Sequence, residues 1–113
     1  MKLAAVITTL SLAATCAHAQ SKQDFQAALD REMHVIDAAT VATCSALHPD
    51  LAQDIDKNWR QNLAALSPDL TEYRKTDAFA KAKAKYEQDQ TLEARKPANQ
   101  KVFQGTCKAM AGR

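Results

Sequence analysis

The spacing of apolar residues after position 20 constrains the fold of this chain more than any other feature. Apolar or weakly polar residues recur there at steps of three or four, which is the period of one face of an α-helix. Ser21, with Asp24 three residues on, resembles the capping box that starts a helix. The sequence therefore predicts one long amphipathic helix over residues 21–47, whose apolar face comprises Phe25, Leu29, Met33, Ile36, Thr40, Cys44 and Leu47.

Two proline positions divide the next part of the chain. Pro49 disfavours a helical conformation at the preceding residue and suits the first position of a new helix. A second apolar stripe follows, and Ser67-Pro68-Asp69 then presents a cap, a proline and a first-turn acid in order. We expect a second helix through the stripe Leu51, Ile55, Trp59, Leu63 and Leu66, and a new helix start at Ser67.

The region after Ser67 leaves two interpretations open. It is either one helix or two, because Thr76-Asp77 is suited to cap a fresh helix that runs to Lys96 before Pro97. Alanine and lysine alternate over residues 80–85, but both residue types favour helix over strand. A short last helix is expected around the apolar positions Val102, Phe103, Thr106 and Met110, with Cys107 beside them.

The first nineteen residues have the pattern of a secretory signal peptide. Lys2 supplies a positive start, residues 3–15 carry no charge, and Ala17-His18-Ala19 places small residues where signal peptidase reads them. The apolar run is shorter than the ~20 residues that span a bilayer. Cys16 raises the alternative of a lipoprotein, but its flanking residues match that signal poorly. We predict cleavage after Ala19, a periplasmic or secreted location, and a single helical domain over residues 20–113.

The predicted cleavage changes the number of cysteines from three to two. Loss of Cys16 leaves Cys44 and Cys107, and disulfides persist in exported proteins. A bridge between them closes a loop of about 64 residues and contributes ~4 kcal/mol in the chain-entropy estimate. Only twenty large apolar side chains and seventeen alanines follow Ala19, so the core is thin. The predicted fold is an all-α bundle of three to four helices stapled by one disulfide.

Trp59 is the first candidate for a binding residue. Tryptophan and arginine dominate binding hot spots, so an exposed Trp59 with Arg60 and Tyr73 would anchor a partner protein. The competing interpretation, which we favour, makes Trp59 the largest packing element of the core because it lies on an apolar stripe. Both hold if the indole lies at the rim of the bundle.

Charge is divided unevenly along the chain. Residues 20–70 carry a net charge of −4 and residues 71–113 a net charge of +5. The simpler interpretation is that the acidic half packs beside the basic half. The alternative is a surface for an anionic partner such as peptidoglycan, lipid headgroups or an acidic protein, formed by Arg74, Lys75, Lys81, Lys83 and Lys85. The small net charge and the lack of a recognition motif argue against nucleic acid.

Two residue sets have the spacing of metal ligands. Asp30, His34 and Asp37 share one helix face, which suits a surface metal site or a pH-sensitive cluster, although a solvated polar face is the interpretation we favour. Cys44 and His48 lie one turn apart and would form three zinc ligands with Cys107. In an oxidising compartment we expect the disulfide instead.

The sequence contains no haem attachment motif, glycine-rich phosphate loop, HExxH motif or nucleophile elbow. We therefore expect neither an enzyme nor a bound cofactor. The leading hypothesis is an exported interaction protein, meaning an inhibitor, immunity protein or small chaperone that binds another exported protein. Lys81 and Lys85 join Trp59, Arg60 and Tyr73 as its candidate partner-binding residues. The alternative is a metal or small-ligand binding protein centred on His34, and a cell-wall hydrolase comes third.

Overall fold

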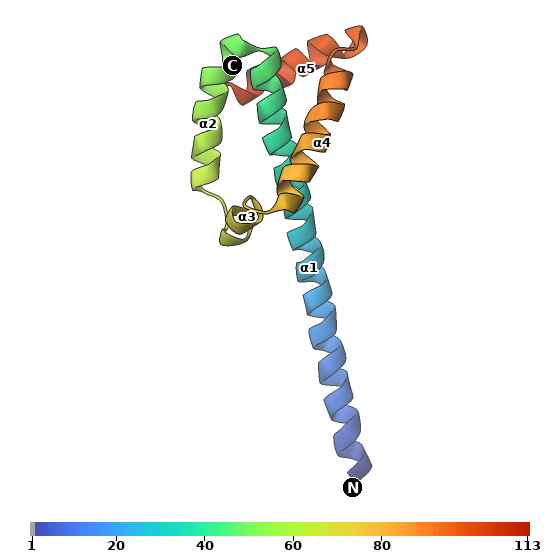
Figure 1. Ribbon diagram of the computed structural model, residues 1–113. Coiled ribbons are helices and arrows are strands. Elements are labelled where there is room, and N and C mark those ends of the chain that lie inside the picture. The colour runs from blue at the N-terminus through green and yellow to red at the C-terminus, as the bar shows by residue number, and fades with distance from the viewer. Residues whose placement is uncertain (1) are drawn as a thin grey trace. The chain divides into compact units, whose positions relative to one another are not determined.

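A computed structural model describes the backbone of residues 2–113 and the side chains of residues 21–113. The described chain is helical (Figure 1) and divides into two compact units, one up to Arg31 and the other from Glu32 to Arg113. Its elements are α1 (Lys2–Leu47), the 3-10 helix η1 (Pro49–Leu51), α2 (Ala52–Ala64), α3 (Pro68–Tyr73), α4 (Asp77–Ala94) and α5 (Pro97–Met110). The prediction of a small helical bundle with one disulfide is confirmed.

Side-chain caps divide the region after residue 67 into separate helices. The Ser67 hydroxyl accepts a hydrogen bond from the backbone N–H of Leu70, and the Thr76 hydroxyl accepts one from that of Phe79, both at 3.2 Å. Each cap satisfies a backbone donor that would otherwise lack a partner in the first turn. The two-helix interpretation is therefore correct, and residues 2–113 form five α-helices rather than three or four.

Pro97 begins a helix as well as ending the segment before it. The predicted fourth helix ends at Ala94 instead of Lys96, and α5 starts at Pro97, several residues earlier than its apolar positions indicate. Proline fits the first helical position because the N–H that it lacks would have no helical partner there. The last helix is consequently longer than predicted.

The start of the first helix also differs from the prediction. α1 begins at Lys2 and continues through Ser21, so Ser21 does not cap it in this chain. Residues 3–19 are rich in alanine and leucine, which favour helix, and no proline interrupts them. The side chains around Cys16 and the predicted cleavage site after Ala19 lie outside the described residues. Among the residues that are described, no helix combines the length and hydrophobicity needed to cross a membrane.

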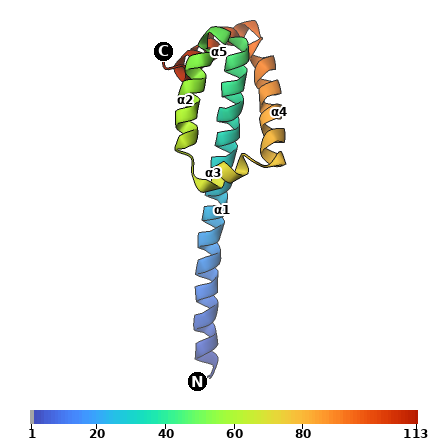
Figure 2. The same cartoon turned by 60° about the vertical axis from the view of Figure 1, so that its left-hand side comes forward.

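The second unit, residues 32–113, is arranged around the last part of α1. In both views α2 and α4 run alongside this part of α1, α3 connects them at one end, and α5 crosses the other end (Figures 1 and 2). Two buried clusters form its core. One surrounds Cys44, Ile55 and Cys107, and the other surrounds Val35 and Phe79.

The buried face of α1 is not the predicted apolar stripe. His34, Val35, Ala38, Ala39, Thr43 and Cys44 are buried on it. Met33 is 54% exposed, and in the first unit Phe25 is 70% and Leu29 44% exposed. Small side chains explain the difference, because alanine lets neighbouring helices approach a backbone closely. The stripe prediction was wrong at its first three positions.

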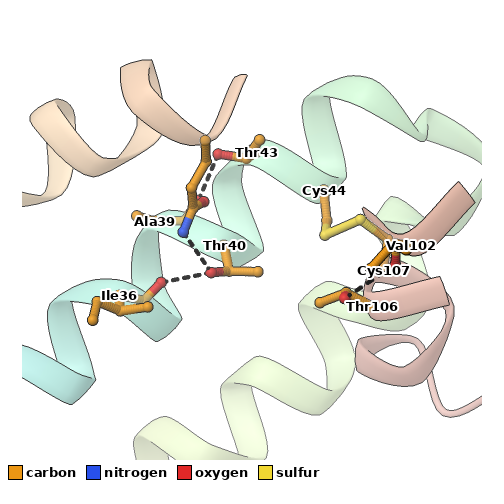
Figure 3. The surroundings of a disulfide bond; sticks show 9 residues. Ile36, Ala39, Thr40, Thr43, Cys44, Val102, Thr106 and Cys107 are labelled. Atoms are coloured by element: carbon orange, nitrogen blue, oxygen red, sulfur yellow. Dashed lines mark hydrogen bonds between the residues drawn. A yellow bond between two sulfur atoms is a disulfide. The ribbon is translucent and has the colours of Figure 1, made fainter. Parts of the chain in front are cut away.

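The disulfide forms as predicted, between Cys44 near the end of α1 and Cys107 in α5, with their Cα atoms 5.3 Å apart (Figure 3). Hydroxyl groups on the same stretch of α1 bond to its own backbone. Thr40 Oγ1 donates to the carbonyl of Ile36 at 2.7 Å and accepts from Gln90 Nε2 of α4 at 2.8 Å. Helices α4 and α5 are thus both attached to the last turns of α1.

Candidate functional site

Trp59 lies at the rim of the second unit. Its side chain is half-buried and packs against the core cluster of Val35, Ala38 and Phe79. Its ring stacks on that of His34, with centroids 5.5 Å apart and planes 16° from parallel. Trp59 is therefore a packing element that keeps part of its ring accessible, which combines the two interpretations of the sequence.

His34 is buried, with 6% of its surface exposed, beneath the Trp59 ring. Arg74 Nη1 lies 2.9 Å from His34 Nε2. Because a guanidinium can only donate, Nε2 must accept, and the ring proton then resides on Nδ1. This geometry requires the neutral form of His34, and it occupies the lone pair that a general base would use.

The electrostatics of the pair agree with its geometry. Burial lowers the pKa of His34, the positive charge of Arg74 lowers it further, and Asp37 opposes them by raising it. Burial also lowers the pKa of Arg74. The neutral imidazole is therefore favoured over the imidazolium.

Arg74 and Phe79 complete the cluster around Trp59. The Arg74 guanidinium carbon lies 5.7 Å from the Trp59 ring centroid and 5.1 Å from that of Phe79. Tyr73 meets Phe79 edge-on at 5.7 Å. We call His34, Trp59, Tyr73, Arg74 and Phe79 the Trp59 cluster. Its members come from α1, α2, α4 and the end of α3, so these contacts hold the indole in one orientation.

A hollow of about 240 Å³ opens beside the indole, and we call it the Trp59 hollow. Apolar side chains of α1, α2 and α5 line it together with polar ones: Val41, Ile55, Trp59 and Met110, with Asp37, Asn58 and Asn62. Asn58 Nδ2 donates to the Met110 carbonyl at 2.9 Å, which holds the end of α5 against α2. The hollow thus has both apolar and polar lining.

The other predicted partner-binding residues lie outside this site. Arg60 is exposed and pairs with Asp56 at 2.9 Å on α2. Lys81 and Lys85 are exposed on α4 and line neither the cluster nor the hollow. The structure packs Trp59 and Tyr73 against the same core cluster but does not add Arg60, Lys81 or Lys85 to them.

Sequence reasoning missed His34, Arg74 and Phe79 as neighbours of Trp59. His34 was expected on a solvated polar face, which was wrong, because the buried face of α1 includes it. Arg74 was recognised only as one member of a basic surface. No spacing along the chain relates position 34 to positions 59 and 74, since packing of α1, α2 and α3 brings them together. The local signal in the sequence was a histidine followed directly by the apolar pair Val35 and Ile36.

Most of the residues predicted as metal ligands have other partners among the described side chains. Arg74 occupies Nε2 of His34, and Asp30 accepts a hydrogen bond from Gln26 at 2.9 Å. Over residues 21–113, no group of three or more His, Cys, Asp or Glu side chains is placed to hold a metal, so Asp30, His34 and Asp37 do not form one. Cys44 and Cys107 are joined to each other and cannot supply thiolates beside His48.

Comparison with protein-family models, curated proteins and solved structures finds no match to this chain. The class of molecule that the fold and site define is therefore a small disulfide-stapled helical bundle with an aromatic and cationic cluster at its rim.

Proposed function

We propose that this protein is exported and acts by binding another exported protein, with the Trp59 hollow as its recognition site. The half-buried Trp59 beside a formed hollow is the observation that carries the proposal. Binding hot spots are enriched in tryptophan and cluster in well-packed pockets. At about 240 Å³ the hollow is smaller than the ~300–1,000 Å³ typical of small-molecule pockets, and this size suits one side chain of a partner.

The lining indicates the chemistry of that side chain. Ile55, Val41 and Met110 offer apolar contact, whereas Asp37 carries a negative charge at the same opening. The Trp59 ring attracts cations through its face. A partner lysine or arginine meets all three requirements, because its apolar stem covers the aliphatic side chains while its charged head reaches Asp37.

Export rests on two supports. The first nineteen residues have the pattern of a signal peptide, and the two cysteines that remain after the predicted cleavage are the two that pair. Disulfides of this kind are typical of periplasmic and secreted proteins. A partner in the same compartment follows from this location, and an inhibitor, immunity protein or chaperone fits it.

The proposed site is tested by substitutions that fill the Trp59 hollow with a large side chain. Asn62→Trp places a large ring at the opening of the hollow from an exposed position, and Gln61→Trp places the same ring at the neighbouring exposed position outside it. Each variant and the parent protein serve as bait in a periplasmic extract, and the captured protein is then titrated by calorimetry. We expect Asn62→Trp to weaken binding at least tenfold and Gln61→Trp to leave it unchanged.

Equal binding by all three baits would contradict the proposed site. Capture of no protein by the parent bait would contradict the proposed function. Equal melting temperatures of the two variants are the control for folding, because both substitutions lie on the exposed surface of α2.

A further inference from the structure

A second and larger hollow lies where α5 begins. It has a volume of about 500 Å³ and is lined from three elements: the end of α1, the end of α4 and the first half of α5. We call it the α5 pocket. It shares no lining residue with the Trp59 hollow. Pro97, the first residue of α5, lines the α5 pocket, whereas Met110, the last residue of α5, lines the Trp59 hollow.

Positive charge dominates the lining of the α5 pocket. Arg95 and Lys101 line it together with His48, and its lining contains no acidic residue. Over residues 21–113 neither Arg95 nor Lys101 forms an ion pair. Glu93 lies two positions from Arg95, but it pairs with Lys96 at 2.6 Å. Among the described side chains, Arg95 and Lys101 therefore line this pocket without a carboxylate partner.

The Glu93 carboxylate lies at the start of α5 and already has partners. It pairs with Lys96 at 2.6 Å and accepts a hydrogen bond from Asn99 Nδ2 at 3.4 Å, while Asn99 Nδ2 also donates to the Glu93 backbone carbonyl at 3.0 Å. Glu93 is therefore engaged by Lys96 and by the first turn of α5 rather than by Arg95 or Lys101.

Apolar side chains form the inner part of the same pocket. Ala94 is buried, while Leu47 and Phe103 are half-buried and border the cavity. Arg95 and Lys101 are exposed. An occupant that satisfies both parts has an apolar body for Leu47 and Phe103 and an anionic head for the two cations.

We propose that the α5 pocket binds a small amphiphilic carboxylate, such as a medium-chain fatty acid. Its volume falls within the ~300–1,000 Å³ of small-molecule sites, unlike that of the Trp59 hollow. Arg95 supplies the planar guanidinium that pairs with a carboxylate through two parallel hydrogen bonds, and Lys101 adds a point charge. Phe103 and Leu47 cover the chain of the ligand.

The test titrates the full exported protein with decanoate, below its micellar concentration, by calorimetry. Decanol and decylamine have the same chain without the anionic head. We expect decanoate to bind at least tenfold more tightly than either. The double substitution Arg95→Gln, Lys101→Gln is expected to weaken decanoate binding at least tenfold, whereas Lys81→Gln, Lys85→Gln removes the same charge outside the pocket and is expected to leave it unchanged.

Four results would overturn the proposal: no decanoate binding up to millimolar concentration, equal binding of decanol, equal loss in both double variants, or tighter binding of a peptide with a free carboxyl-terminal leucine. The last result would assign the pocket to a protein terminus instead. Asn62→Trp serves as the control for independence, because blocking the Trp59 hollow is expected to leave decanoate binding unchanged. If decanoate does not bind, the proposed binding of a partner protein at the Trp59 hollow is unaffected. If no partner protein binds, the proposed ligand of the α5 pocket is likewise unaffected.

Discussion

At the scale of single residues, the pair of His34 and Arg74 shows how a buried imidazole and a half-buried guanidinium fit side by side in so small a bundle. A buried charge is costly unless it is partnered, and Arg74 meets this demand with a neutral acceptor and two aromatic faces. His34 in turn satisfies its Nε2 without taking up a proton. The arrangement holds only while His34 remains neutral, which makes it sensitive to pH.

The first prediction concerns that sensitivity. Because the pKa of His34 is lowered from 6.5 on folding, the unfolded chain binds a proton at a higher pH than the folded one. The free energy of unfolding therefore decreases as the pH falls below about 6.5, and it continues to decrease until the pH passes the folded pKa. We expect the melting temperature to fall over this range.

His34→Gln is the matched variant, because a glutamine oxygen can accept from Arg74 without titrating. All other titratable groups are shared by the two proteins. We expect the melting temperature of His34→Gln to depend less on pH between about 7.5 and 5 than that of the parent. Parallel melting curves across this range would show that His34 does not contribute.

The second prediction is the energetic cost of removing the indole. Full burial would make Trp59→Ala cost ~3–5 kcal/mol, but the half-buried ring of Trp59 has fewer contacts to lose, so we expect ~2 kcal/mol in urea denaturation. Leu92→Ala on the exposed face of α4 is the control, with an expected change near zero. A loss above ~4 kcal/mol would instead place the indole in the core.

At the scale of elements, short polar motifs determine where the helices begin. Ser67 and Thr76 adopt extended conformations, with ψ of 156° and 154°, and their hydroxyls accept from the third residue of the following helix. Without the Thr76 cap, the turn between α3 and α4 would leave a backbone donor of α4 unsatisfied. That turn also carries Arg74, so the cap helps to position the Trp59 cluster.

The third prediction follows from this cap. We expect Thr76→Ala to lower the free energy of unfolding by ~1 kcal/mol, because Ala cannot accept from the Phe79 N–H. Thr106→Ala in α5 removes an exposed hydroxyl that bonds only to its own helix, at 3.3 Å, and is expected to have little effect. Equal changes in the two variants, measured by urea denaturation, would argue against a capping role.

Local chemistry explains which features of the fold the sequence predicts. Neighbouring residues alone predict the caps at Ser67 and Thr76 and the helix end before Pro49. The pairing of Cys44 with Cys107 follows from the number of cysteines that remain after the predicted cleavage. The buried face of α1 depends instead on which helices pack beside it, and Ala38 and Ala39 carry little hydrophobic signal of their own. The Trp59 cluster requires four helices to meet, so the sequence indicated Trp59 and Tyr73 but not that His34, Arg74 and Phe79 would be their neighbours.

At the scale of the whole molecule, the disulfide joins the end of α1 to α5 inside one cluster of a thin core. Cys44 and Cys107 are 63 residues apart in the chain, and both are fully buried with Leu51 and Ile55. The loop they close contains α2, α3 and α4, so the bridge limits the freedom of most of the unfolded chain. A bundle with few large apolar residues depends on such a constraint.

The fourth prediction is the effect of removing the bridge. A loop of this length corresponds to ~4 kcal/mol in the chain-entropy estimate, and each kcal/mol shifts the melting temperature by ~4–8 °C in a domain of this size. We expect Cys44→Ala, Cys107→Ala to melt more than ~10 °C below the parent. A difference below ~5 °C would show that packing alone sustains the bundle.

The central claim is that a partner protein contacts Trp59, and the chain offers a direct probe because Trp59 is its one tryptophan. The protein labelled with 5-fluorotryptophan has a single fluorine resonance, which is followed while the unlabelled captured partner is added. We predict that this resonance shifts or broadens in proportion to the complex formed, and that Gln61→Trp, a second labelled site outside the hollow, shows an additional resonance that stays in place. A Trp59 resonance unmoved at saturation by calorimetry would contradict the account.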